Sequence, residues 1–144
     1  MTEAFVLCAG QGERLWPLST LLPKCLWPIG GQPCARVIVD RLLRGNVTDG
    51  VENFPVSRPI FVCCLEKDRE LFEHEFRDLE VHIISTEEPR GTAGQIVAYN
   101  RKPGDEIAIN DHFLIHYGDC LVDVDFTDLL KVHRESMASA TLVL

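Results

Sequence analysis

Short apolar runs alternate along the chain with amphipathic and polar segments, and this alternation predicts the secondary structure. We expect strands where apolar and β-branched residues cluster between turn-forming residues. These runs are residues 4–8, 59–65, 79–84, 111–117 and 140–144. Apolar residues at helical spacing predict helices over residues 35–43, 93–100 and 126–138, and residues 66–77 form a charged amphipathic segment.

Two other segments carry turn-forming and polar residues. Residues 15–33 contain four prolines and a Gly-Gly pair, which excludes a long helix and predicts an extended segment lying across the domain. Residues 45–57 are predicted to form a polar loop.

The order of these elements predicts the fold class. Because strands alternate with helices, we expect a doubly wound α/β domain: a Rossmann-like, mostly parallel sheet with helices on both faces. The last predicted strand, residues 140–144, ends at the final residue of the chain. We therefore expect a domain that is incomplete at its C-terminus.

Composition narrows the classes of partner. The 144 residues are 46% apolar and 25% charged, as in one ordinary globular domain, and the formal net charge is −8. Such a chain lacks the broad basic surface that nucleic acids require, whereas a nucleoside triphosphate needs only a few converging cations and backbone N–H groups. No apolar run approaches the ~20 residues that span a bilayer, and no signal-peptide pattern is visible. We expect a cytoplasmic protein that binds neither nucleic acid nor membrane.

The cysteines do not suggest a metal site or a disulfide framework. Six are present, none of them in a CxxC pair. Cys63 and Cys64 are adjacent within a predicted strand, so their side chains should point to opposite faces of the sheet. We interpret the six as reduced and mostly buried small hydrophobic residues.

Unusual residues gather where three predicted strands end. They are residues 9–14, 86–92 and 118–119, and the carboxyl ends of parallel strands are where open α/β sheets bind ligands. Gly10 and Gly12 let backbone N–H groups approach a phosphate closely, but Leu15 replaces the third glycine of GxGxxG. By itself this glycine turn is equally consistent with a tight turn without function.

Two cations favour the phosphate interpretation. Arg14 follows the glycines, and the proline-containing stretch after it is stiff enough to return Lys24 to the same sheet edge. A forked guanidinium suits terminal phosphates and an ammonium suits a single phosphate. The alternative is that both are ordinary surface cations. Asp119, after Gly118, is either a turn or cap residue or a carboxylate ligand for a divalent metal ion.

A longer motif match adds a family resemblance. The run LCAGQGERLWPLSTLLPKCLWPIGGQP (residues 7–33) resembles the signature of sugar-phosphate nucleotidyltransferases, roughly A-G-x-G-x-R-L-x-P-L-(S/T)-x-x-x-P-K-x-L-x-P-(I/V)-x-G-x-P. EEPRGTAGQI (residues 87–96) is similar to the G-T-A-G element of that family. HYGDCLVDVDFTDLLKVHRESMASATL (residues 116–142) is similar to its G-D strand end and the helix that follows.

The resemblance implies a reaction and assigns roles to residues. A nucleoside monophosphate would pass from a nucleoside triphosphate to a sugar 1-phosphate, with release of pyrophosphate and formation of a nucleotide sugar. Arg14 and Lys24 would be catalytic, Arg14 at the β- and γ-phosphates and Lys24 at the α-phosphate, and Asp119 would hold Mg²⁺. The residues implied in nucleotide binding are Ala9, Gly10, Gly12, Arg14, Lys24, Gly91 and Thr92.

The same resemblance leaves alternatives open. Residues 1–144 correspond to the N-terminal nucleotide-binding part of longer family members, and a homo-oligomer is compatible with it. Thr86 stands where relatives often carry a Gln or Glu that reads the base, so the base is undetermined. Glu13 replaces the usual Thr or Ser and places a carboxylate in the phosphate loop, which is harmless if its side chain points outward. Trp16, in the run RLWPLS, is a feature similar to guanylyltransferases that act on mannose 1-phosphate. One aromatic residue does not identify the sugar. A non-catalytic nucleotide-binding module and a transferase acting on a non-sugar phosphate are the competing interpretations.

Four further residues are possible metal ligands by residue type: His112, His116, Asp123 and Asp125. The two histidines are four residues apart, but on a strand that spacing does not create the shared face that it would on a helix. We interpret them as structural. Asp123 and Asp125 precede a predicted helix, so we expect a turn role for the first and a helix-cap role for the second.

Overall fold

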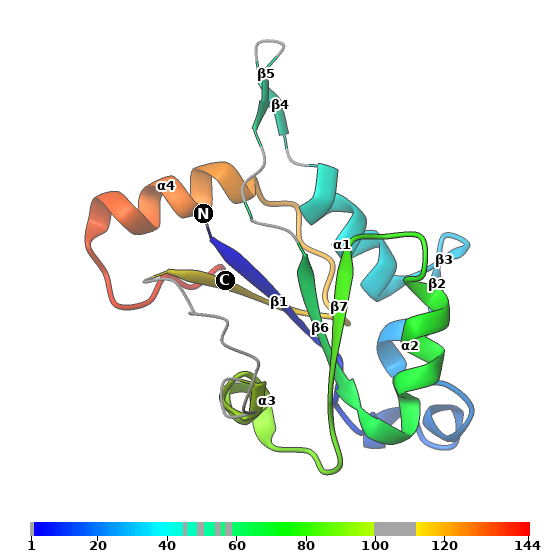
Figure 1. The fold of residues 1–144 in the computed structure, drawn as a ribbon. Helices are drawn as coiled ribbons and strands as arrows, with labels where there is room; N and C mark the ends of the chain where they lie inside the picture. The colour runs from blue at the N-terminus through cyan, green and yellow to red at the C-terminus, as the bar shows by residue number, and fades with distance from the viewer. Residues whose placement is uncertain (1, 45, 49–50, 54–55, 57–58, 100–111) are drawn as a thin grey trace.

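A four-stranded parallel sheet forms the centre of the computed structural model, which describes residues 2–44, 46–48, 51–53, 56, 59–99 and 112–144 (Figure 1). The strand order is β7-β6-β1-β8, and all three neighbouring pairs are parallel. The strands are β1 (Glu3–Leu7), β6 (Ile60–Leu65), β7 (Val81–Thr86) and β8 (Phe113–Tyr117). The prediction of a mostly parallel sheet is confirmed.

The central strand β1 is buried on both faces, and its side chains alternate between two cores. Ala4, Val6 and Cys8 belong to the larger core, whereas Phe5 and Leu7 belong to a smaller one. A strand buried on both sides must be apolar at every position, which explains the uninterrupted run AFVLC. Cys63 and Cys64 of β6 divide between the two cores in the same way, as predicted.

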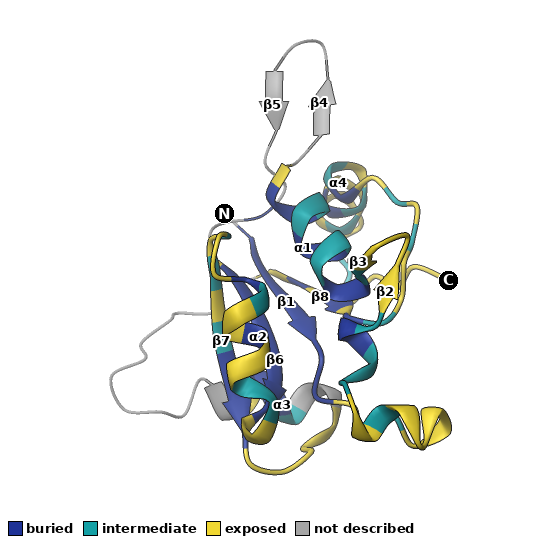
Figure 2. Cartoon of the chain, turned by 90° about the vertical axis from the view of Figure 1, so that its right-hand side faces the viewer, coloured by how far each residue is buried: buried dark blue, intermediate teal, exposed yellow. Residues whose placement is uncertain are grey.

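Four α-helices in the described part of the chain cover the two faces of the sheet. They are α1 (Cys34–Arg44), α2 (Arg69–Glu75), α3 (Gly91–Tyr99) and α4 (Phe126–Ser136). Side chains of α1, α2 and α4 pack into the larger core, and Ile96 of α3 packs into the smaller core on the other face (Figures 1 and 2). Helices therefore lie on both faces, as predicted.

The strand order creates a reversal beside β1. From β1 the chain proceeds through α1 to β6 and through α2 to β7, and then crosses back through α3 to β8 on the other side of β1. Such a reversal opens a crevice beyond the carboxyl ends of the two strands that flank it. Here those strands are β1 and β8, which end at Leu7 and Tyr117.

Residues 13–33, which include the segment 15–33 predicted to be extended and free of long helix, contain three single 3-10 turns and a short hairpin. The turns are η1 (Glu13–Leu15), η2 (Leu18–Thr20) and η3 (Lys24–Leu26). The hairpin pairs β2 (Pro28–Ile29) with β3 (Gln32–Pro33). The prolines thus limit the helical stretches to single turns.

Two predictions of secondary structure are wrong. The loop predicted over residues 45–57 contains an antiparallel hairpin of β4 (Asn46–Thr48) and β5 (Val51–Asn53). Asp-Gly between two short runs is a strong hairpin signal in sequences, and the polar composition concealed it. Residues 140–144 form no strand, because the chain reverses after α4, where Met137 has φ 50°, and Thr141 Oγ1 lies 2.9 Å from His133 Nδ1 of that helix.

Smaller differences concern where elements begin and end. The third strand begins at Val81 instead of residue 79, since the backbone N–H of Leu79 donates to Phe76 and continues the turn after α2. The predicted first residue of the fourth strand, Asp111, lies outside the described residues. Within the described parts of the chain, no helix is long and apolar enough to span a membrane.

Candidate functional site

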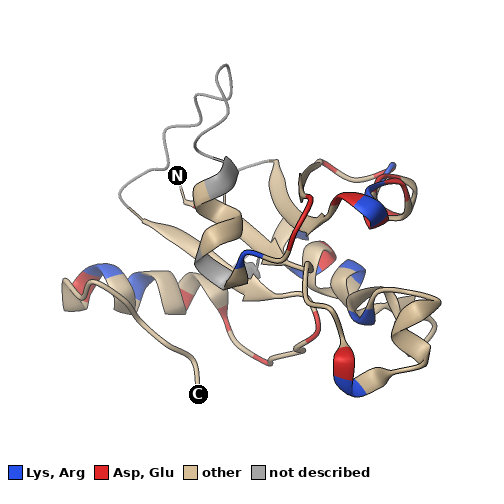
Figure 3. Ribbon diagram, turned by 90° about the horizontal axis from the view of Figure 1, so that it is seen from below, with Lys and Arg blue, Asp and Glu red and all other residues tan. Residues whose placement is uncertain are grey.

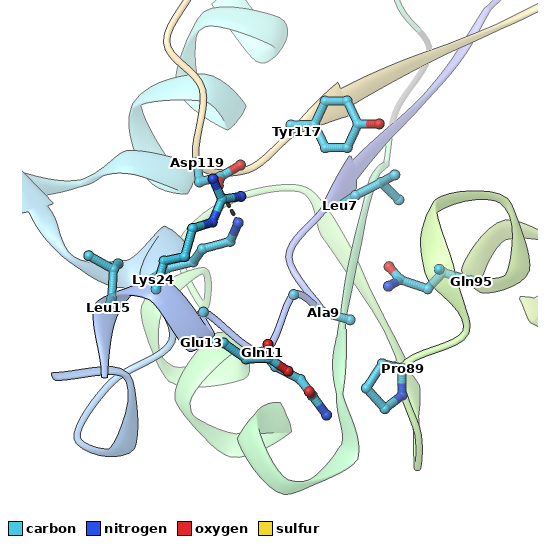
Figure 4. A pocket seen from close by; sticks show the side chains of 14 residues that line it. Leu7, Ala9, Gln11, Glu13, Leu15, Lys24, Pro89, Gln95, Tyr117 and Asp119 are labelled. Carbon is cyan, nitrogen blue, oxygen red and sulfur yellow. Dashed lines mark ion pairs between the residues drawn. The ribbon is translucent and has the colours of Figure 1, made fainter. Parts of the chain in front are cut away.

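A cavity of about 680 Å³ opens at the reversal of the sheet, beyond the ends of β1 and β8 (Figure 4). Four segments form its wall: the loop after β1, the η3 turn, the start of α3 and the end of β8. Its lining residues are Leu7, Ala9, Gly10, Gln11, Gly12, Glu13, Arg14, Leu15, Lys24, Pro89, Gly91, Gln95, Tyr117 and Asp119. The volume lies in the range of pockets that bind small molecules.

Lys24 and Asp119 form an ion pair at one end of this cavity, although they come from distant parts of the sequence (Figure 4). Their side chains are 29% and 28% exposed, so both ions keep partial access to solvent. Partial burial alone raises the pKa of the Asp119 carboxyl, but the hydrogen bond and the charge of Lys24 outweigh it and lower that pKa. Asp119 is therefore an anion at neutral pH, balanced by one cation.

The glycine loop approaches Lys24 closely. A Cβ atom on Gly10 would lie 3.1 Å from Cε of Lys24, so a side chain at this position would require the lysine to shift by a few tenths of an ångström. Gly12 has φ 64°, in the left-handed region, and is the residue before η1. The backbone conformation therefore favours glycine at Gly12, and Gly10 leaves room for the Lys24 side chain.

Asp119 is held in place by the packing beneath it. The backbone N–H of Gly118 donates a 2.9 Å hydrogen bond to the carbonyl oxygen of Leu7, which ties the ends of β8 and β1 together. A Cβ atom on Gly118 would overlap Sγ of Cys8. Cys25, next to Lys24, lies in the same buried layer, and its Sγ is 3.7 Å from the carbonyl oxygen of Cys8. The buried thiols of Cys8 and Cys25 therefore pack against the backbone that carries the ion pair.

Arg14 and Glu13 bring opposite charges to the cavity from the η1 turn. Both side chains are exposed and both residues line the cavity, so the carboxylate of Glu13 is not directed away from the candidate site. Over the rest of the described chain, acidic and basic residues are interspersed (Figure 3). The positive charge that Arg14 and Lys24 provide is therefore local to this loop.

The other end of the cavity is less charged. Leu7, Ala9 and Pro89 line it together with Gln95, whose side chain extends from α3 toward the loop after β1 (Figure 4). Gln95 is 5% exposed, and its Oε1 accepts no hydrogen bond from any residue that the structure describes. A buried amide without a partner costs about 1–3 kcal/mol. Sequence reasoning missed Gln95; its position four residues after Gly91 on the same helix is the signal that points to it.

The structure therefore brings together most of the predicted site residues. Those that line the one cavity are Ala9, Gly10, Gly12, Arg14, Lys24, Gly91 and Asp119. Thr92 is the second residue of α3, and its side chain lies outside the described residues. Thr86 is not among the residues that line the cavity, and its hydroxyl donates a 3.0 Å hydrogen bond to the carbonyl oxygen of Glu88.

Three other candidate metal ligands make hydrogen bonds or ion pairs within the fold. His116 is buried and its Nδ1–H donates to the carbonyl oxygen of Tyr117 at 2.8 Å; burial lowers its pKa. Asp125 caps α4 by accepting hydrogen bonds from the backbone N–H groups of Thr127 and Asp128, as predicted. Asp123 pairs with Arg41 at 3.4 Å.

A magnesium ion requires oxygen ligands, and the described residues offer few. No group of three or more His, Cys, Asp or Glu side chains within them is arranged to hold a metal ion. Asp119 is an ionised carboxylate on the cavity wall, 28% exposed. Mg²⁺ commonly binds one or two carboxylates and completes its shell with substrate phosphates and water, so this donor set fits a metal that arrives with a polyphosphate.

Comparison with known proteins places these residues in a family. The family model described as nucleotidyl transferase matches residues 3–144. A mannose-1-phosphate guanylyltransferase of Mycobacterium tuberculosis is 30% identical over 147 residues, covering 99% of this chain and 36% of the relative. A mannose-1-phosphate guanyltransferase of Schizosaccharomyces pombe is 31% identical over 143 residues, covering 98% of this chain and 37% of the relative.

A solved structure shares the fold. It is the crystal structure of a Bacillus anthracis protein assigned as a glucose-1-phosphate thymidylyltransferase, with a TM-score of 0.72 and 17% identity over 94% of this chain and 51% of that one. The chain spans about a third of the length of the two guanylyltransferases. Because the family model covers nearly every residue, including all of the cavity, this chain belongs to the nucleotidyl transferase family.

Proposed function

We propose that residues 1–144 form the nucleotide-binding part of an enzyme that transfers a nucleoside monophosphate from a nucleoside triphosphate to a sugar 1-phosphate. The observation that carries this proposal is the convergence of Arg14, Lys24 and Asp119 on one cavity at the sheet reversal. The names of the relatives favour GTP and mannose 1-phosphate as the first pair of substrates to test.

The reaction needs charge neutralisation more than proton transfer. A phosphate oxygen of the sugar 1-phosphate attacks the α-phosphorus, a new P–O bond forms, and the bond to the β-phosphate breaks as pyrophosphate leaves. The attacking phosphate is already an anion near neutral pH, so no general base is required. Catalysis then depends on position and on cations beside the phosphates. Arg14 and Lys24 are the cations that line the described part of the cavity.

The ion pair between Lys24 and Asp119 supports these roles. Before a nucleotide binds, the two side chains neutralise each other. When the triphosphate enters, Lys24 exchanges its carboxylate partner for the α-phosphate, and Asp119 becomes free to hold Mg²⁺. Bound in this way, Mg²⁺ would offset charge on the phosphates and on the departing pyrophosphate. Arg14 would contact the β- and γ-phosphates, for which its forked guanidinium is suited.

Pyrophosphate release tests this proposal. The chain is incubated with Mg²⁺, GTP, ATP, CTP, UTP or dTTP, and mannose, glucose or N-acetylglucosamine 1-phosphate. We expect Lys24→Ala and Arg14→Ala each to reduce turnover by about 100-fold or more, as loss of a transition-state charge partner does. Lys131→Ala and Arg77→Ala remove the same charges from exposed helix and turn positions and should leave turnover unchanged.

Two results would contradict the proposal. Unchanged turnover in Lys24→Ala and Arg14→Ala would show that the site is elsewhere. Triphosphate binding without turnover for any pair would instead support a non-catalytic nucleotide-binding module. Thermal stabilisation by each triphosphate, measured in parallel, separates these two results.

A further inference from the structure

Gln95 is a buried polar side chain without an intramolecular role in the described structure. It is 5% exposed, its Oε1 has no hydrogen-bond partner among the described residues, and it lines the cavity. Rotating the amide by 180° would place the NH₂ group in the same position and leave a donor unpaired instead. In either orientation the buried amide requires a partner that the described residues do not provide.

The two ends of the cavity differ in chemistry, and this difference orients a nucleotide. The Lys24–Asp119 ion pair stands at one end and Arg14 also lines the cavity, which suits a triphosphate and its metal ion. Figure 4 shows Ala9 between this charged end and Gln95, so a nucleotide that lies along the loop after β1 directs its nucleoside toward α3. The amide is thus at the end of the cavity where the base would lie.

The surroundings of Gln95 suit a flat heteroaromatic ring. Leu7 and Ala9 are buried apolar residues of the cavity wall, and Pro89 contributes a further apolar surface beside Gln95 (Figure 4). Each nucleobase presents a donor next to an acceptor along its edge, and a side-chain amide can pair with both at once. Thr86, the nearby strand-end residue, has already donated its hydroxyl to Glu88.

We propose that Gln95 is the specificity-determining residue that reads the base of the bound nucleotide through its side-chain amide. This inference rests on the proposed function, because it takes the charged end of the cavity as the triphosphate site. Gln95 selects among triphosphates through the base edge, whereas Arg14 and Lys24 bind the phosphates that all of them share.

Calorimetric binding of Mg²⁺ complexes of GTP, ATP, CTP, UTP and dTTP tests the inference, with tripolyphosphate as the base-free probe. We expect the wild-type chain to prefer one base. Gln95→Met keeps the length of the side chain and removes both hydrogen-bonding groups. It should weaken binding of the preferred triphosphate by about 10- to 100-fold, reduce the preference, and leave tripolyphosphate binding unchanged. Gln32→Met makes the same change at an exposed strand position and should have no effect.

A second readout separates base recognition from a structural role. Gln95→Met removes an unpaired buried amide, so the unliganded variant should melt at a temperature about 3–6 °C higher than wild type while binding its nucleotide more weakly. A structural hydrogen bond would produce the opposite change in melting temperature. Gln95→Glu replaces the NH₂ donor with a second acceptor, and should change the ratio of affinities among the five bases even if all of them fall.

The possible failures are distinguishable. Equal base preference in wild type, Gln95→Met and Gln95→Glu overturns the role of Gln95 and leaves the proposed function standing. Wild-type binding of all five triphosphates without preference does the same. If neither a triphosphate nor tripolyphosphate binds to the wild-type chain, both proposals are wrong.

Discussion

Gly118 lies where three parts of the candidate site pack together, and replacing it with alanine tests that packing. Its φ is outside the left-handed region, so alanine introduces no backbone strain there. The added methyl group would overlap Sγ of Cys8 and lie 3.1 Å from the carbonyl oxygen of Leu7. Overpacking a core in this way costs about 1–3 kcal/mol, and we expect Gly118→Ala to lower the free energy of unfolding by about 2 kcal/mol.

A double-mutant cycle assigns this loss to the thiol. Cys8→Ala alone removes one buried sulfur and should cost about 1 kcal/mol, as deletion of a single buried group does. In the double variant the methyl group occupies the place of the sulfur, so the total loss should be about 1 kcal/mol instead of the additive ~3 kcal/mol. The remaining loss comes from the close contact with the Leu7 carbonyl oxygen, which neither substitution removes.

Urea unfolding at 25 °C measures each term, since a domain of this size is expected to unfold in one transition. Cys120→Ala, which removes an exposed thiol two residues away, is the control and should leave stability within about 0.5 kcal/mol of wild type. If Gly118→Ala is as stable as wild type, or if the two losses simply add, the methyl group and the sulfur do not compete for space and the reasoning fails.

Three further predictions follow from other parts of the structure. Asp125→Ala should lower the free energy of unfolding by about 1 kcal/mol through loss of the α4 cap, whereas Asp128→Ala, from the first turn, should cost less; equal losses in urea unfolding would contradict the cap. Because the folded-state pKa of Asp119 is lowered, the carboxylate stabilises the fold at neutral pH, and this contribution is lost as the pH falls through that lowered pKa. The stability difference between wild type and Asp119→Asn should therefore shrink at acidic pH, and a difference that grows would refute it. Burial raises the pKa of Cys63 and Cys64 to about 12, so Ellman's reagent at pH 8 should modify the exposed Cys120 first, and a second thiol reacting as fast would contradict the buried arrangement.

Local patterns in the sequence predicted the sheet and the glycine turn after β1. Apolar runs without alternation predicted strands buried on both faces, and β1 and β6 have that burial. Gly10 and Gly12 predicted a turn in which glycine permits a positive φ, and Gly12 has that conformation with φ 64°. A run of apolar residues and a glycine turn are local patterns, so the sequence alone was enough to predict them.

Local patterns failed where pairing partners decide the structure. Residues 140–144 have high β-propensity, but a strand also needs a neighbour for its backbone hydrogen bonds, and the turn at Met137 instead returns this segment to His133 of α4. The β4–β5 hairpin was missed for the converse reason, since its polar residues satisfy each other's backbone groups without a hydrophobic run.

Within the candidate site, the sequence predicted that Arg14 and Lys24 lie at the same sheet edge, and both line the cavity there, while two arrangements depended on the tertiary structure. The pairing of Lys24 with Asp119 arises only because β8 returns beside β1 and brings the two strand ends together. The local sequence GTAGQI does not predict that Gln95 is a buried amide without a hydrogen-bond partner. Gln95 is buried because α3 packs on the face of the sheet opposite α1. Burial of this kind depends on residues that are distant in the sequence.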